Sequence, residues 1–166
     1  MPRIFAAFVT GHLLVLMGVA GLGLLDPAPD PTRHIMLAVF ALLLSSLLQV
    51  MVFMYLTVTG KVIVQAVHLG GLDLAPVYEA KRLKARFIRI LAAVVGALVL
   101  VTATGAYQWR EGVSSYMHFS AASAFLLVHL VAAYLEFALI CANKALMNKV
   151  LRSYTPRSGN VPAANA

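Results

Sequence analysis

The residues best suited to chemistry are four polar side chains within one long apolar stretch, residues 116–143. His118, His129, Glu136 and Asn143 follow one another at intervals of 11, 7 and 7 residues. On an α-helix that turns about 100° per residue, these intervals bring each side chain to within about 20° of the next and all four to within about 40°. Polar groups are costly inside a membrane, so this stripe is expected to face other helices and to be a candidate for function.

The histidines of the chain fall into two levels of depth. His12 and His129 each lie 13 residues from the outer end of their apolar stretch, at residue 25 and residue 116, which corresponds to about 20 Å. His34 and His118 both lie near the outer ends. Two levels of paired imidazoles are a ligand arrangement suited to b-type haem in a membrane four-helix bundle.

We therefore interpret His12 and His129 as candidate axial ligands of haem b, with Gly11 or Gly18 leaving room for the macrocycle. His34 and His118 are a weaker second pair, because His34 also fits a simple interfacial role. No metal site beyond a haem iron is expected. The single cysteine, Cys141, excludes an intrachain disulfide and argues against iron–sulfur or cysteine-rich zinc sites.

A second interpretation assigns the deep polar residues to proton chemistry. Glu136 and His129, two turns apart, are candidates for a proton relay or a quinone-headgroup site together with Gln49, Ser45 and Ser46 of the second stretch. Gln49 lies at about the same depth as His129. Hydrogen bonds between helices would account for the same residues without any further function.

The elements that carry these residues are four apolar stretches, at residues 4–25, 34–58, 87–106 and 116–143. Each has about 20 residues or more, enough to cross about 30 Å of hydrocarbon as a helix. Hydrophobic residues make up 61% of the 166 residues and charged residues 11%. A chain this short has too little interior to bury that excess. The sequence predicts an all-α integral membrane protein, a four-helix transmembrane bundle with up-down topology.

Basic residues predict the orientation of this bundle. Only Arg33 and Arg110 flank the outer ends of the stretches, whereas the other 11 of the 13 Lys and Arg residues lie on the opposite side. This bias predicts that both termini are cytoplasmic, in a bacterial inner membrane. The net charge of +7 is attributed to the same bias and to lipid headgroups, not to nucleic acid. The first stretch is expected to be retained and not cleaved as a signal peptide.

The domain organisation predicted from the sequence is one transmembrane domain, residues 1–152, and a disordered cytoplasmic tail, residues 153–166. Residues 59–86 are predicted to extend the second and third helices into a cytoplasmic αα-hairpin. Gly70 and Gly71 would end the second helix, Asp73 would cap the third, and Pro76 suits its first turn.

Three functions are compatible with the sequence. The first is an accessory or anchor subunit of a larger membrane complex, which associates with other membrane subunits or with itself. The second is a haem b-binding electron-transfer subunit, and the third is a proton-relay or quinone-site subunit. The chain has no HExxH, GxSxG or phosphate-binding glycine motif, so no self-contained enzyme is expected. Its architecture is similar to that of small membrane cytochrome b anchors in general, which by itself assigns no residue a role.

Overall fold

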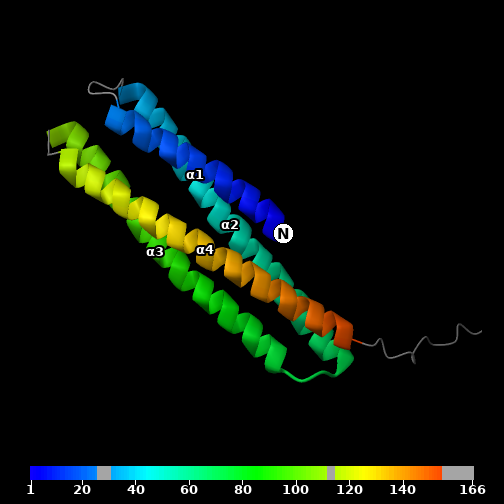
Figure 1. Cartoon of the computed structure of the whole chain (residues 1–166). Helices are drawn as coiled ribbons and strands as arrows, with labels where there is room; N and C mark the ends of the chain where they lie inside the picture. The colour runs from blue at the N-terminus through cyan, green and yellow to red at the C-terminus, as the bar shows by residue number, and fades with distance from the viewer. Residues whose placement is uncertain (26–30, 112–114, 155–166) are drawn as a thin grey trace, which may run out of the picture.

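The computed structural model describes residues 1–25, 31–111 and 115–154, and within them the chain forms four long α-helices. The helices are α1 (Pro2–Leu25), α2 (Pro31–Gly70), α3 (Ala75–Glu111) and α4 (Ser115–Ser153). The chain reverses direction between successive helices, so that neighbours in sequence run antiparallel along one elongated bundle (Figure 1). The predicted tail lies outside the described residues except for its first two positions.

Each of the four helices is long and apolar enough to cross a membrane, as the sequence predicts. The 24 residues of α1 correspond to about 36 Å, and the 40 residues of α2 to about 60 Å. Large apolar side chains such as Leu14, Leu43 and Leu127 remain exposed along the helices. This exposure is favourable in lipid, whose tails are as apolar as leucine. The fold is therefore that of an integral membrane protein.

The helices α2 and α4 form the centre of the bundle. They contact each other, and each also contacts α1 and α3, whereas α1 and α3 make no contact within the described part of the chain. Two side-chain pairs define how α2 and α4 are aligned, His34 with His118 and Thr59 with Asn143. Both pairs join residues that are 84 positions apart. The two helices are thus parallel, and a residue of α2 lies level with the residue 84 positions later on α4.

Beyond the apolar stretches, the chain continues as a three-helix extension, made of residues 61–70, 75–86 and 144–153 (Figure 1). The sequence predicts α2 and α3 as a hairpin here. In the structure α4 continues beyond the fourth apolar stretch to Ser153 and packs with the hairpin. Ile63, Val67 and Val150 are at most 2% exposed in the core of this extension. The third helix gives these side chains a surface on which to pack.

The turn between α2 and α3 explains where both helices end. Gly71 has a positive φ of 59°, a conformation that glycine adopts without the steric penalty of a Cβ atom. The Leu72 amide donates to the Val67 carbonyl at 3.0 Å, and the Gly71 amide donates to the His68 carbonyl at 3.4 Å. These two bonds form a Schellman motif. The Leu74 carbonyl accepts the first bonds of α3, so Leu74 occupies the cap position that the sequence analysis assigned to Asp73.

Candidate functional site

The polar stripe of α4 faces the interior of the bundle, as its helical spacing predicts. His129 and Glu136 are 2% exposed and Asn143 is 1% exposed, whereas His118 is half-buried near the beginning of α4. Among the described residues, every other buried polar side chain belongs to α1 or α2. These are His12, Ser45, Gln49 and Thr59. The buried side chains of α3 are all apolar, so α3 supplies packing to this site and no buried polar group.

His12 of α1 and His129 of α4 form the inner histidine pair. Their ring centroids are 4.5 Å apart, and the ring planes meet at 69°. His12 is fully buried. Neither ring nitrogen of His12 has a hydrogen-bond partner among the described residues, and the same holds for Nδ1 of His129. Two imidazoles therefore meet in an apolar interior with at least three nitrogen atoms unpaired.

His34 of α2 and His118 of α4 form the outer histidine pair. Their ring centroids are 6.4 Å apart with an interplanar angle of 79°. Nδ1 of His34 has no partner in the described part of the chain, and Nδ1 of His118 lies 3.4 Å from the Thr104 hydroxyl. A Cβ atom at Gly105 would lie 3.0 Å from Cε1 of His118. The absence of a side chain at Gly105 thus makes room for the His118 ring against α3.

The two pairs are stacked along α4, because His118 and His129 are 11 residues apart. That interval corresponds to about 16 Å, about half of the hydrocarbon thickness. The sequence analysis paired these histidines by depth alone, and the structure brings the members of each pair side by side. Whether they bind haem iron stays a prediction.

Comparison of the chain with protein-family models, with curated proteins and with solved structures finds no match.

Imidazole nitrogen is a donor that suits haem iron, and His12 with His129, and His34 with His118, are the residues that would hold it. The ring centroids lie 6.4 Å apart in the outer pair and 4.5 Å apart in the inner pair. Small side chains face the interior next to both levels, namely Ala41, Ala121 and Ala132.

The two glycines that were expected to make room for a macrocycle do not line the inner pair. Gly11 and Gly18 are exposed, and a Cβ atom at either position would meet nothing within 4 Å. α1 contacts α2 and α4 and does not contact α3 in the described residues.

Polar side chains of α2 lie beside the polar stripe of α4 between the inner histidine pair and the three-helix extension. Gln49 lies beside the Glu136 carboxyl, and Nδ2 of Asn143 donates to the Thr59 hydroxyl at 2.6 Å. Tyr55 lies beside the same Asn143 side chain. Gln49 and Ser45 are predicted from the sequence, whereas Tyr55 and Thr59 are not. Ser46, also predicted, is exposed and bonds to its own helix backbone. The position of Thr59, 14 residues and about four turns after Ser45, is the pattern that would have identified it.

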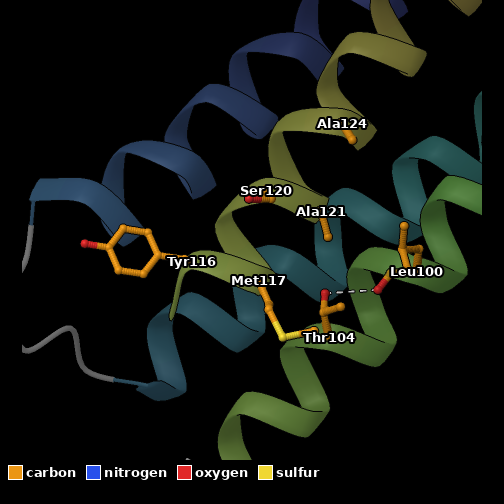
Figure 2. Close-up of a pocket in the computed structure, with 7 residues that line it drawn as sticks. All are labelled: Leu100, Thr104, Tyr116, Met117, Ser120, Ala121 and Ala124. Atoms are coloured by element: carbon orange, nitrogen blue, oxygen red, sulfur yellow. Dashed lines mark hydrogen bonds between the residues drawn. The ribbon is translucent and has the colours of Figure 1, made fainter. Parts of the chain in front are cut away.

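A shallow groove of about 470 Å³ opens between α3 and α4 near the outer pair. Figure 2 shows that Thr104 and Leu100 of α3 face Met117 and Ala121 of α4 across it, with the Thr104 hydroxyl bonded to the Leu100 carbonyl. Most of its lining is apolar, so the groove suits a lipid chain. Among the described residues no cluster of three or more His, Cys, Asp or Glu side chains is arranged to hold a metal ion. The histidine pairs are therefore the candidate functional site.

Proposed function

We propose that this protein is a membrane electron-transfer subunit that binds haem b between α4 and its neighbours. His12 and His129 would ligate one haem, and His34 and His118 a second. The observation that carries this proposal is the stacking of two histidine pairs in one bundle, each with unpaired ring nitrogens. When bound, haem supplies one-electron redox chemistry.

The unpaired nitrogens favour haem over a purely structural accessory or anchor role. A buried polar group without a hydrogen-bond partner costs about 1–3 kcal/mol. His12 alone has two such atoms, and His129 and His34 have one each. An anchor helix needs no buried histidine, and leucine would fill the same space at no cost. Ligation of iron would use one nitrogen of each ring and would offset that cost. Association with other membrane subunits remains compatible with the exposed apolar helix faces.

Haem binding is tested by the absorption spectrum of the protein purified in detergent from haem-replete cells. We expect a Soret band and the sharp visible bands of low-spin bis-histidine haem, with about two haems per chain. A pyridine haemochrome assay against protein concentration measures this ratio. A colourless preparation that also fails to take up added haemin would contradict the proposal.

The proposed orientation places the three-helix extension and both termini in the cytoplasm of a bacterial cell. It is supported by eight exposed basic residues on or next to the extension, which lie on the side opposite Arg33. They are Lys61, Lys81, Arg82, Arg86, Arg89, Lys144, Lys149 and Arg152. Such residues remain preferentially on the cytoplasmic side during insertion.

Cysteine labelling tests this orientation in a Cys141→Ala background. We expect a membrane-impermeant maleimide to label Tyr107→Cys, near the outer end of α3, in intact spheroplasts. Leu69→Cys, exposed on the extension, should be labelled only after the membrane is permeabilised. The opposite labelling pattern would show that the extension lies outside the cytoplasm.

A further inference from the structure

The polar side chains from the inner histidine pair to the three-helix extension are arranged as a column along α2 and α4. Because α2 and α4 align with an offset of 84 residues, Ser45 lies level with His129, and Gln49 lies one turn further along. Tyr55 lies between the levels of Glu136 and Asn143, and Thr59 is level with Asn143. Successive members of the column are therefore three or four residues apart, a rise of about 5–6 Å for each step.

Several polar atoms of this column lack the hydrogen-bond partners that a purely structural set of buried polar residues would have. One carboxyl oxygen of Glu136, the amide oxygen of Gln49 and the Ser45 hydroxyl are buried without a partner in the described residues. Glu136 is 2% exposed. Buried polar groups in folded proteins are normally paired with protein or water. A carboxyl group that keeps an unpaired oxygen at this depth is placed to exchange a proton with water that enters the bundle.

We infer that Glu136 takes up protons from the side of the three-helix extension, through Asn143, Thr59 and Tyr55. In each uptake, a hydrated proton at that end of the bundle passes along the hydroxyl groups and intervening water. It ends on the Glu136 carboxylate, which becomes a neutral carboxyl group. The reverse step returns the proton to the same side. Gln49 and Ser45 continue the column from Glu136 to the inner histidine pair. The proton held by Glu136 therefore lies close to that pair.

The groups that surround Glu136 are compatible with this role. The other titratable side chains of the described interior are His129 on α4 and His12 on α1, with Tyr55 on α2 and Cys141 on α4 partly buried, whereas the buried residues of α3 are apolar. No described Lys or Arg side chain is buried with it. A permanent ion pair would lock the carboxyl group in its charged form, and none is present among the described residues. The inference does not depend on haem, because it concerns the chain's own groups.

The experiment is infrared spectroscopy of the full chain in lipid, with rapid exchange from H₂O to D₂O. Glu136 is the acidic residue of the interior, so the band of a buried protonated carboxyl group should be absent in Glu136→Gln. In the wild type we expect this band to shift promptly in D₂O. Thr59→Val and Asn143→Leu should each slow the shift by about tenfold or more, because each removes a hydrogen-bonding member of the column.

Two matched controls replace hydroxyl groups that lie outside the column. Thr102→Val and Ser46→Ala each remove an exposed hydroxyl that bonds only to its own helix backbone, and both should exchange at the wild-type rate. Thr59→Val is nearly isosteric, so it remains informative if Asn143→Leu misfolds. A shift rate in Thr59→Val equal to that of the wild type, or a carboxyl band that persists in Glu136→Gln, would overturn the inference. Because no haem is required, this outcome is independent of the haem spectrum.

Discussion

Replacement of His129 with alanine is expected to abolish haem binding at the inner pair and to lower the haem content from about two to about one per chain. His12 would be left as a single ligand, and no other described histidine lies near it. The remaining haem should keep its low-spin spectrum, because the outer pair, His34 and His118, is about 16 Å away along α4. A pyridine haemochrome assay measures the number of haems per chain. A redox titration measures the number of redox components, which should fall from two to one.

The matched control is His68→Ala, which removes an exposed histidine of the three-helix extension. It should leave both haem content and spectrum unchanged. His118→Ala should give the reciprocal result, with loss of the other redox component. If His129→Ala retains two haems per chain, the inner pair does not ligate haem and the assignment of His12 is wrong as well.

Truncation of Ile63 to alanine is expected to destabilise the chain by about 2–5 kcal/mol. Ile63 is fully buried in the core of the three-helix extension. With the extension in water, as proposed above, its burial is driven by exclusion of water, so removal of three carbon atoms costs both transfer free energy and a cavity. Equilibrium unfolding in mixed micelles measures the change, and limited proteolysis at the exposed basic residues should become faster in parallel.

The control for this variant lies one residue away. Val62 is 36% exposed, so Val62→Ala should change the free energy of unfolding by less than about 1 kcal/mol. Equal effects of the two substitutions would mean that Ile63 is not in a water-excluding core. The extension would then be a basic surface segment rather than a folded three-helix unit.

The haem and proton proposals place two kinds of chemistry on different parts of one helix. The outer two levels of α4 carry histidine pairs, whereas the inner two carry Glu136 and Asn143 with partners from α2. Electron transfer into a low-dielectric interior is opposed by the charge that it creates, and a proton that arrives nearby compensates that charge. A carboxyl group one level below the inner pair is in a position to hold such a proton.

The sequence alone was sufficient for the properties that depend on one helix at a time. Twenty consecutive apolar residues define a membrane-spanning helix by local composition, and all four such helices are present. The spacing of His129, Glu136 and Asn143 predicts a single face by helical geometry, and that face is buried. The depth of a histidine follows from the rise per residue, so the two levels were also predictable.

Only the tertiary structure decided which side chains meet across helices. The spacing within α1 does not say that His12 faces α4, because this depends on the rotation of α1 and on which helices lie beside it. The same applies to Thr59, whose bond to Asn143 requires the parallel alignment of α2 with α4. The continuation of α4 to Ser153 depends on a surface that α2 and α3 create together. Depth is a property of one helix, whereas the choice of neighbour depends on the packing of the whole bundle.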